Sequence, residues 1–363
     1  MTGAEKEKGI MSKAQELIKK EGLVGMIITD PYNMRHISGF RGGEGALYIS
    51  ATQQVLITDS RYTEQAEKES DFTIVQEHRG HTREQIFAEC LEKEEGTLAI
   101  GYEDQSLLCS QFDKMKKALP VKEWVPMGGK VDVLRRIKTA EEIEYLAQAE
   151  HIGDVAFSRI LDFLKPGVSE LEVAAELEYQ MKKAGAEDLG FNTIIASGLN
   201  SSMPHAIPGR KKLEAGDFVT MDFGCKYEGY CSDMTRTVVI GKANDKQKEI
   251  YNVVLEAQLA GLAAVKAGKT GKEVDKAARD IITKAGYGDC FGHSLGHSVG
   301  LFIHEKPGLA PSDETVLQAG MIETVEPGIY VPGFGGVRIE DMVLVTETGC
   351  RNLAGSPKEL IEL

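Results

Sequence analysis

The sequence predicts an α/β protein in two parts, a smaller α/β domain over residues 1–130 and a larger domain over residues 131–363. Two observations predict this arrangement. Up to about residue 125, short apolar runs of strand length alternate with helical runs, as in a compact α/β domain. Beyond the Pro- and Gly-containing segment 126–129, which we take as the boundary, the chain repeats itself. The repeat predicts a second domain made of two related halves.

The first part is expected to alternate strands with helices. Its predicted helices cover residues 12–21, 82–94 and 106–119, with one more opening at 59–62, and its predicted strands cover residues 24–29, 46–50, 54–58 and 97–102. No stretch of it concentrates acids and histidines. The residues alone therefore predict no catalytic or metal site in this part.

The second part opens with a capping box, Thr139-x-x-Glu142, and a predicted helix that runs to about residue 164. Two later motifs, Lys165-Pro166-Gly167 and the capping box Ser169-x-x-Glu172, return 101 residues further on as Lys266-Ala267-Gly268 and Thr270-x-x-Glu273. A second echo, residues 221–224 against 325–328, has an offset of 104 residues. Echoes in the same order predict a duplicated helix-plus-sheet unit, with two pseudo-twofold halves that share one sheet.

Acidic residues follow this symmetry in the first half. Residues 217–225 and 231–240 are predicted strands joined by a tight turn at 227–229. In a two-residue hairpin the paired positions have an odd sum, so Asp222 and Asp233 are expected on one face.

The second half offers a matching pair. Residues 321–326 and 337–346 are predicted strands joined by Pro- and Gly-rich turns. Side chains alternate along a strand, so Arg338 and Glu340 share one face and Asp341 lies on the other. Glu326 and Glu340 are therefore expected to be the counterparts of the first pair.

Histidines gather in the segment Phe-Gly-His-Ser-Leu-Gly-His-Ser-Val-Gly-Leu-Phe-Ile-His-Glu at residues 291–305. His293, His297 and His304 are three of the chain's eight histidines. Glycines recur between them and disfavour a helix. We expect a glycine-rich turn that leads into a strand at residues 299–304 and presents imidazoles toward a site. A single histidine here would more often be a satisfied core or loop residue; three among glycines favour a site.

Four carboxylates converging on one face would repel one another unless cations neutralise them. Two divalent ions would balance the four charges, and His297 would supply a nitrogen ligand. Oxygen-dominated ligation with one imidazole suits Mn²⁺, Co²⁺ or Fe²⁺ better than a thiolate-type zinc site. We therefore expect two divalent metal ions, Mn²⁺ first, with Co²⁺, Fe²⁺ or Zn²⁺ as alternatives, a pair that hydrolases use to activate water. Each acid taken singly would more often be a surface residue than a metal ligand. The symmetric placement of all four acids favours a metal site.

Bulk properties exclude several classes of protein. The net charge of −14 disfavours nucleic acid and anionic membranes as partners. The charged N-terminus lacks the apolar core of a signal peptide, and no run approaches the length of a membrane span. The six cysteines include no C-x-x-C pair, which favours reduced thiols and a cytoplasmic location.

Taken together, residues 293–305 with the four acids resemble the proline-specific metallopeptidases of the pita-bread fold, aminopeptidase P and prolidase. The resemblance covers nearly the whole chain. Residues 33–40 and 58–62 resemble the creatinase-type N-terminal domain, although His36 stands where that family commonly has an aromatic residue. The resemblance implies a creatinase-type α/β domain followed by a pita-bread catalytic domain.

The resemblance also implies a role for each site residue. The metal ligands would be Asp222, Asp233, His297, Glu326 and Glu340. Glu326 would in addition shuttle a proton between the bridging water and the leaving nitrogen. His205 and His304 would steady the substrate carbonyl and the tetrahedral intermediate; the role of His205 rests on the resemblance alone. His293 would line the pocket, and Arg338 would hold a metal-bound carboxylate.

The implied reaction is hydrolysis of the Xaa-Pro bond in peptides with proline at the second position. Gly308 stands where several dipeptide-cleaving relatives carry an arginine for the substrate's C-terminal carboxylate, which favours aminopeptidase P over prolidase. Lys306 or a residue of the first domain would otherwise supply that charge. Glu323 is unusual in this family and, by strand parity, is expected to be an outward or interface acid.

Alternative readings are weaker. Creatinase lacks the ligand set, and methionine aminopeptidase ordinarily lacks the large N-terminal domain. A non-catalytic peptide-binding pita-bread module would be expected to have lost ligands. Relatives are often dimers or tetramers, so a homodimer or higher homo-oligomer is the family expectation.

Overall fold

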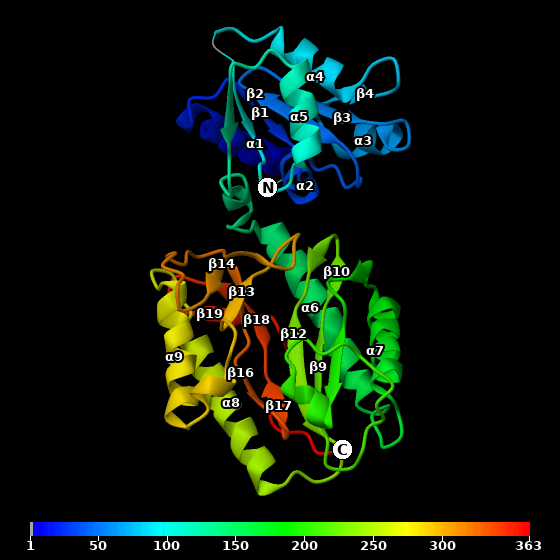
Figure 1. Cartoon of the computed structure of the whole chain (residues 1–363), viewed down its shortest axis with the longest axis vertical. Helices are drawn as coiled ribbons and strands as arrows, with labels where there is room; N and C mark the ends of the chain where they lie inside the picture. The colour runs from blue at the N-terminus through cyan, green and yellow to red at the C-terminus, as the bar shows by residue number, and fades with distance from the viewer. Residues whose placement is uncertain (1–2, 97) are drawn as a thin grey trace. The chain divides into compact units, whose positions relative to one another are not determined.

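The computed structural model describes residues 3–96 and 98–363 (Figure 1). The chain divides into two compact units, Met1–Arg135 and Arg136–Leu363. The predicted strand at 97–102 begins at Thr97, which lies outside the described residues. Among the helices described, none is long and apolar enough to cross a membrane.

The first unit is an open six-stranded sheet in the order β4-β3-β2-β1-β5-β6. Its elements are α1 (Gly3–Lys20), β1 (Gly25–Ile28), α2 (Pro31–Ser38), β2 (Ala46–Ser50), β3 (Gln54–Thr58), α3 (Thr63–Glu69), β4 (Thr73–Gln76), α4 (Arg83–Leu91), β5 (Ala99–Tyr102), α5 (Cys109–Ala118), β6 (Glu123–Pro126) and the 3₁₀ turn η1 (Asp132–Arg135). Strand β1 alternates its side chains between two cores. Met26 and Ile28 pack with α1 and α2, whereas Ile27 packs with α4 and α5, so helices cover both faces.

The second unit consists of two helix-plus-sheet halves. The first half contains α6 (Ala140–Ile160), α7 (Glu170–Ala184), β7 (Asp188–Leu189), β8 (Ile194–Ser197), the 3₁₀ turn η2 (Gly198–Ser202), β9 (Phe218–Phe223), β10 (Cys225–Tyr227), β11 (Tyr230–Cys231) and β12 (Met234–Val239). The second half contains α8 (Asp245–Ala264), α9 (Gly271–Lys284), the 3₁₀ turn η3 (Gly288–Cys290), β13 (Gly296–Ser298), β14 (Glu305–Leu309), β15 (Ile322–Val325), β16 (Gly328–Val331), β17 (Gly335–Arg338), β18 (Asp341–Val345) and β19 (Cys350–Asn352).

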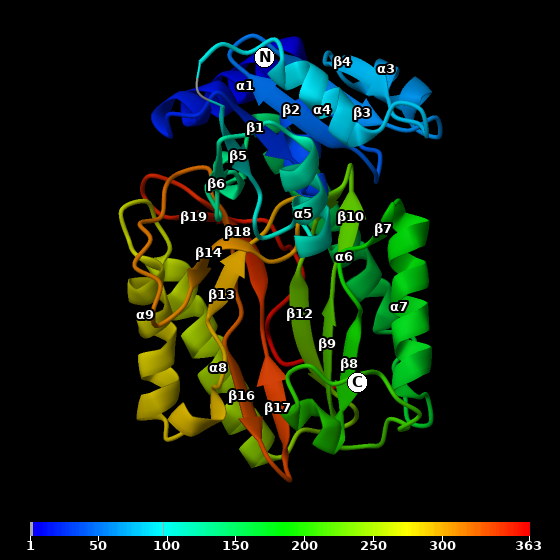
Figure 2. The ribbon, with the colours of Figure 1, turned by 45° about the horizontal axis from the view of Figure 1, so that its top comes forward.

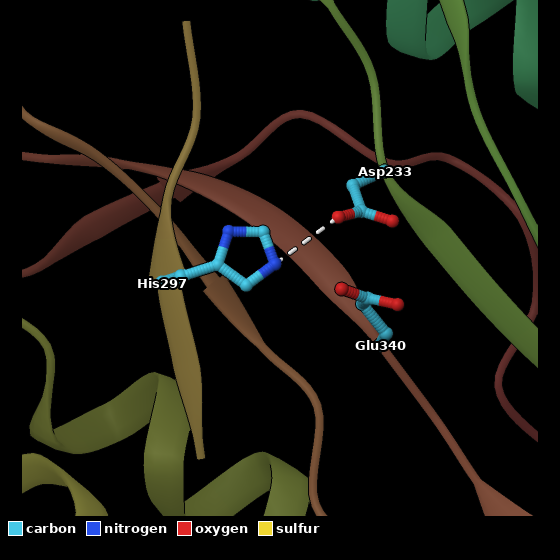
Figure 3. Close-up of side chains that lie close together, drawn as sticks. All are labelled: Asp233, His297 and Glu340. Carbon is cyan, nitrogen blue, oxygen red and sulfur yellow. Dashed lines mark ion pairs between the residues drawn. The ribbon is translucent and has the colours of Figure 1, made fainter. Parts of the chain in front are cut away.

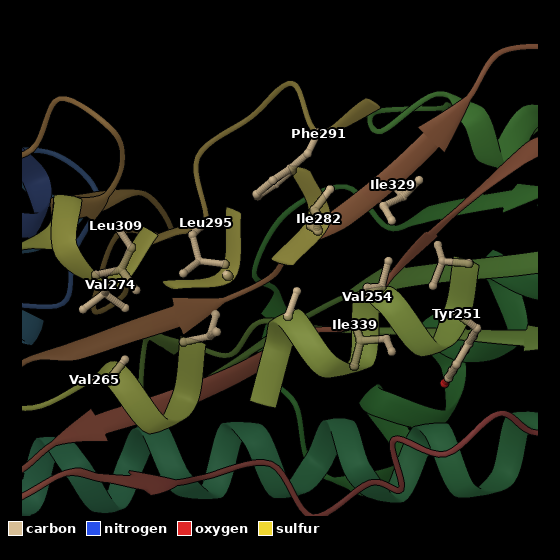
Figure 4. Close-up of a cluster of buried hydrophobic side chains, with 14 of the residues drawn as sticks. Tyr251, Val254, Val265, Val274, Ile282, Phe291, Leu295, Leu309, Ile329 and Ile339 are labelled. Atoms are coloured by element: carbon tan, nitrogen blue, oxygen red, sulfur yellow. The ribbon is translucent and has the colours of Figure 1, made fainter. Parts of the chain in front are cut away.

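Each half packs a helix pair against its own strands. Helices α6 and α7 cover β8, β9 and β12, and α8 and α9 cover the strands of the second half (Figures 2 and 4). The predicted capping boxes form at the starts of α6, α7 and α9, where the Thr139, Ser169 and Thr270 side chains accept the N–H three residues on. Ser169 and Thr270 each also form an isolated bridge, to Lys212 and Val316 respectively. The duplicated unit expected from the sequence repeat is therefore present.

The prediction that both halves share one sheet is wrong. Strands β8, β9 and β12 form one sheet, and β13, β14, β15, β18 and β19 form another. The halves meet at Glu340, whose N–H donates to the Thr235 carbonyl at 3.1 Å, and at Thr237, whose hydroxyl donates to the carbonyl of Arg338 in β17 at 3.0 Å. The chain leaves the β17 ladder after Arg338 and joins the β18 ladder at Asp341, so individual hydrogen bonds rather than a continuous ladder connect the halves here.

The hairpin between β10 and β11 follows the predicted parity. Its two loop residues, Glu228 and Gly229, have φ values of 45° and 68°, as a two-residue hairpin turn requires. Lys226 pairs with Cys231, and the same register continues to Asp222, which pairs with Thr235. Asp222 and Asp233 therefore lie on the same side of their hairpin.

Arg236 links the halves from the opposite side of β12. Its side chain is 2% exposed, and its guanidinium binds the Asp341 carboxylate at 2.8 Å. It also donates to the carbonyls of Ser356 and Pro357 at 2.8 and 3.0 Å. The arginine thus joins β12, β18 and the C-terminal segment through one buried group.

Replacing Arg236 by methionine is expected to lower the free energy of unfolding by about 3 kcal/mol, because it leaves a buried carboxylate with one cationic partner fewer. Urea unfolding measures the change. The matched control is Arg159→Met on the exposed side of α6, for which a change within about 0.5 kcal/mol is expected. A loss below about 1 kcal/mol for Arg236→Met would contradict the proposed link.

Candidate metal centre and active site

One pocket of the second unit brings the predicted site residues together. It has a volume of about 560 Å³. All nine side chains singled out from the sequence line it: His205, Asp222, Asp233, His293, His297, His304, Glu326, Arg338 and Glu340. They come from both halves, so neither half forms the pocket by itself.

Three of these residues form a cluster with the geometry of a metal site. One ligand atom each from Asp233, His297 and Glu340 lie within 4.8 Å of one another, and their side chains converge from three different strands (Figure 3). His297 Nε2 is 3.4 Å from Asp233 Oδ2 and 3.5 Å from a carboxylate oxygen of Glu326. His297 Nδ1 is 3.1 Å from the Ser298 carbonyl, which can only accept a hydrogen bond. The Nδ1 proton therefore points away from the cluster, leaving Nε2 directed at the carboxylates.

The acids occupy strand ends next to the junction of the two sheets. Asp222 lies near the end of β9, and Asp233 immediately precedes β12. Glu326 follows β15, and Glu340 immediately precedes β18. At these positions side-chain oxygens from four strands reach the same space, as the repeat predicted.

Burial and mutual repulsion raise the pKa values of Asp233, Glu326 and Glu340. Burial, together with the charge of Asp222, raises the pKa of Asp233 to about 6. Burial and the charge of Asp233 raise the pKa of Glu326 to about 7, and the same causes raise that of Glu340 well above its ordinary value. Burial opposes protonation of His297, but its hydrogen bond to Asp233 and the charge of Glu326 prevail and raise its pKa to about 9.

Two buried carboxylate oxygens in the pocket have no hydrogen-bond partner among the residues that the structure describes. These atoms are Asp222 Oδ1 and Glu340 Oε1. A buried charged oxygen without a partner is costly, and divalent cations satisfy such oxygens directly. The donor set of carboxylates with one imidazole therefore fits hard divalent ions.

Partners of these ligands hold them in place. Arg338 Nη2 donates to Asp222 at 2.6 Å, and its Nε donates to the Thr235 hydroxyl at 3.1 Å. Thr235 in turn donates to Glu340 at 2.6 Å. On the other side, Thr324 donates to Glu326 at 3.1 Å and accepts the His297 N–H at 3.1 Å.

Sequence reasoning missed Thr235, Thr324 and Tyr330. The first two have a signal that would have found them, because each lies two residues from a predicted ligand on the same strand face, Thr235 beside Asp233 and Thr324 beside Glu326. Tyr330 gives no comparable signal. Its hydroxyl accepts from Arg338 Nη1 at 2.8 Å and lies 2.9 Å from His293 Nε2.

The remaining histidines differ in their surroundings. His293 is held between the Ser294 carbonyl at 2.8 Å and Tyr330, and burial with the charge of Arg338 lowers its pKa to about 4. It is therefore a neutral ring. The His304 residue is exposed, and its ring centroid is 4.6 Å from that of His297. Partial burial of the ring and the charge of His297 lower the pKa of His304. His205 is exposed on the loop after η2.

The predicted strand at residues 299–304 is wrong. Strand β13 ends at Ser298 and β14 begins at Glu305, so these residues form the connection that carries His304. A Cβ at Gly300 would lie 2.6 Å from the Glu305 carboxylate, which Lys138 holds by an ion pair of 3.0 Å. The Gly300 carbonyl accepts from the Cys231 N–H at 2.9 Å instead of from a neighbouring strand of its own sheet.

Glu323 does not face outward, and that prediction is wrong as well. Its parity is as expected, because Thr324 and Glu326 take the pocket side. However, Glu323 is fully buried, and both carboxyl oxygens lack partners among the described residues. Burial raises its pKa well above the ordinary value, so the group is neutral.

Comparison with known proteins gives matches in both parts. Residues 11–137 match the creatinase/prolidase N-terminal domain, and residues 144–347 match metallopeptidase family M24. The Xaa-Pro dipeptidase of Pyrococcus furiosus is 42% identical over 97% of this chain and 99% of its own. Among solved structures, a Bacillus anthracis Xaa-Pro dipeptidase has a TM-score of 0.94 at 46% identity, covering 98% of this chain and 100% of its own. An X-Pro aminopeptidase from Thermotoga maritima has a TM-score of 0.88 at 38% identity, covering 94% and 98%.

The raised pKa values predict how the stability of the metal-free protein depends on pH. Carboxyls with folded pKa values of about 6 and 7, above the unfolded value of about 4, stabilise the fold fully below pH 4. That stabilisation is lost as the pH rises through 6 and 7. Urea unfolding of the chelator-treated protein is therefore expected to show stability falling between pH 5 and 7.5.

Glu326→Gln is the matched control, because it removes one titrating carboxyl and should flatten the slope. Saturating Mn²⁺ should stabilise the wild type more as the pH rises, since metal displaces protons from its ligands. Stability that increases with pH across this range without metal would contradict the electrostatic description.

Proposed function

Because the chain belongs to metallopeptidase family M24, we propose that this peptidase is an Xaa-Pro dipeptidase that uses two divalent metal ions. The observation that carries the proposal is the cluster of Asp233, His297 and Glu340 in a chain that is similar, over almost its whole length, to proteins named Xaa-Pro dipeptidases. The preference for aminopeptidase P drawn from Gly308 is not supported by these relatives. We therefore favour the prolidase alternative.

The metal ions would be held by Asp222, Asp233, His297, Glu326 and Glu340, and Mn²⁺ fits this donor set. When bound, such ions polarise a scissile carbonyl and lower the pKa of a bound water toward neutrality. The pocket's orphaned carboxylate oxygens, Asp222 Oδ1 and Glu340 Oε1, support this assignment.

Glu326 is the proposed proton carrier. The bond to proline is a tertiary amide, so its nitrogen has no N–H and must receive a proton as it leaves. As a carboxylate in the pocket beside the proposed metal ligands, Glu326 could take a proton from the attacking water and pass it to the leaving nitrogen. The Thr324 hydroxyl, donating to one oxygen of Glu326, fixes the direction of that carboxyl.

The two exposed histidines are the proposed donors to the substrate carbonyl. His205 and His304 line the pocket from loops of opposite halves. Their N–H groups would meet the oxygen on which negative charge develops as water attacks. Neutral His293, held by Tyr330, would shape the pocket without adding charge.

Lys306 is the proposed anchor for the free carboxylate of a dipeptide. Of the described residues that line the pocket, Lys306 and Arg338 carry permanent positive charges. Arg338 is buried and bound to Asp222, Tyr330 and Thr235. Lys306 is exposed and has no ion-pair partner among the described residues, so its ammonium is available to a ligand. It lies two residues from Gly308, so its charge would replace that of the arginine missing at Gly308.

Substrate length tests the proposal directly. The Mn²⁺-loaded protein is offered an equimolar mixture of an Xaa-Pro dipeptide and the matching Xaa-Pro-Xaa tripeptide, and both products are followed in one reaction. Faster dipeptide cleavage is expected. Faster tripeptide cleavage would return the assignment to aminopeptidase P, and cleavage of neither substrate by the metal-bound protein would refute the Xaa-Pro peptidase function.

Lys306→Met is expected to raise KM for the dipeptide at least about tenfold, because it removes a charged hydrogen bond worth roughly 1.5–3 kcal/mol. The KM for the corresponding Xaa-Pro amide, which lacks the carboxylate, should be unchanged. Lys272→Met, whose lysine pairs with Glu314 outside the pocket, is the matched control. Equal effects on acid and amide would show that Lys306 does not bind the carboxylate.

The homo-oligomer expected from the family stays a prediction.

The six cysteines are unpaired thiols, as expected from their spacing.

A further inference from the structure

The loop that carries His205 is fastened at its base by one buried carboxylate. Glu170, the first residue of α7, is fully buried. Its oxygens accept the Ser197 N–H and hydroxyl, both at 2.8 Å, and the Asn200 side-chain amide at 3.0 Å. They also accept the Gly209 N–H at 3.1 Å. Donors from both ends of the segment 197–209 therefore converge on a single side chain.

The rest of this loop has fewer restraints. The Pro204 carbonyl accepts from Arg338 at 3.3 Å, and the Ser201 hydroxyl accepts the Gly336 N–H at 2.8 Å. Beyond them, Ile207 is 87% exposed, and His205 is exposed without a hydrogen bond to any described residue. No hydrogen bond from its ring to a described residue holds His205 in place. We infer that its position depends on the backbone of the loop, which is bound at Pro204 and at the base.

In the second half, a different residue accepts backbone N–H groups close to the pocket histidine. Beyond the His304 loop, the Asp313 carboxylate accepts the N–H groups of Gly308 in β14 and of Thr315 at 2.8 and 2.9 Å. The repeat places Gly271 at the position of Glu170, as the first residue of α9. A Cβ on Gly271 would lie 2.1 Å from the Gly308 carbonyl, so no side chain fits there. The Asp313 carbonyl also accepts the Lys272 N–H at 2.8 Å, so Asp313 lies beside the start of α9 and binds the segment that follows His304.

We propose that Glu170 is a positioning residue for the reaction, acting by holding the base of the His205 loop so that the imidazole faces the substrate carbonyl. The proposal rests on the proposed function for its catalytic consequence. A carboxylate is suited to this task because it accepts four hydrogen bonds and donates none. Glutamine in its place would direct an amide N–H₂ at one of the same donors.

Glu170→Gln is expected to lower kcat for the Xaa-Pro dipeptide about 10- to 100-fold, since displacing a reacting group by about 1 Å costs a factor of this size. The distinguishing measurement is a double-mutant cycle with His205→Ala. In the His205→Ala background, Glu170→Gln should change kcat less than about twofold, because the group that it positions is gone. The matched control is Glu172→Gln. Glu172 lies in the same first turn of α7, and its exposed carboxylate accepts the Ser169 N–H. This variant should keep the wild-type kcat.

A second readout does not depend on activity. Amide hydrogen exchange at residues 203–208 should be faster in Glu170→Gln than in the wild type, and unchanged in Glu172→Gln and at the His304 loop. If Glu170→Gln does not fold, Asn200→Ala removes one donor from the loop side and enters the same cycle.

Two results would overturn the proposal: an equal loss of kcat with and without His205, or unchanged exchange in the loop. A wild type that cleaves no Xaa-Pro peptide would refute the proposed function, while the exchange experiment would still decide whether Glu170 holds the loop.

Discussion

The structure of the second unit depends on burying four carboxylates beside one imidazole where two sheets meet. Burial and mutual repulsion raise the pKa values of Asp233, Glu326 and Glu340 in the metal-free protein. The arrangement persists because Arg338, Thr235 and Thr324 each hold one or two ligands by direct hydrogen bonds. Such a site is poised for divalent cations, which replace the protons and satisfy the orphaned oxygens.

Duplication explains how one chain brings these acids together. Each half contributes carboxylates at the ends of its strands, and each contributes a loop histidine to the pocket. The halves do not merge into one hydrogen-bonded sheet, and the gap in the ladder at Glu340 leaves room for side chains to converge. Behind it, the buried pair of Arg236 and Asp341 closes the junction on the side away from the pocket. The two halves are related by the repeat, but their sheets are separate. The site between them is asymmetric because only the second half contributes an imidazole next to the acids, that of His297.

The substrate end of the pocket shows how specificity can shift without a change in the catalytic groups. The same metal ligands suit an aminopeptidase and a dipeptidase, because both hydrolyse a bond to proline. What separates them is recognition of a free carboxylate one residue beyond that bond. Here the charge that is available lies on Lys306, because Arg338 is committed to holding Asp222. Under the proposed function, selectivity would depend on the exposed side chain of Lys306 in β14 rather than on the residues that would hold the metal ions.

The sequence by itself determined the fold class, the duplication and the residues that gather in the pocket. Period-two alternation, capping boxes and the repeat at an offset of about 100 residues can be read directly from the order of residues. Tertiary structure decided the rest. The connection 299–304 was predicted as a strand following a glycine-rich turn, but the Glu305 carboxylate lies against Gly300 and the Cys231 N–H binds the Gly300 carbonyl. Strand parity placed Glu323 opposite Glu326, yet only packing determined that this opposite side is core rather than surface. Tyr330 and Glu170 likewise acquire their partners across 8 to 39 residues of chain, a distance over which no local pattern specifies contact.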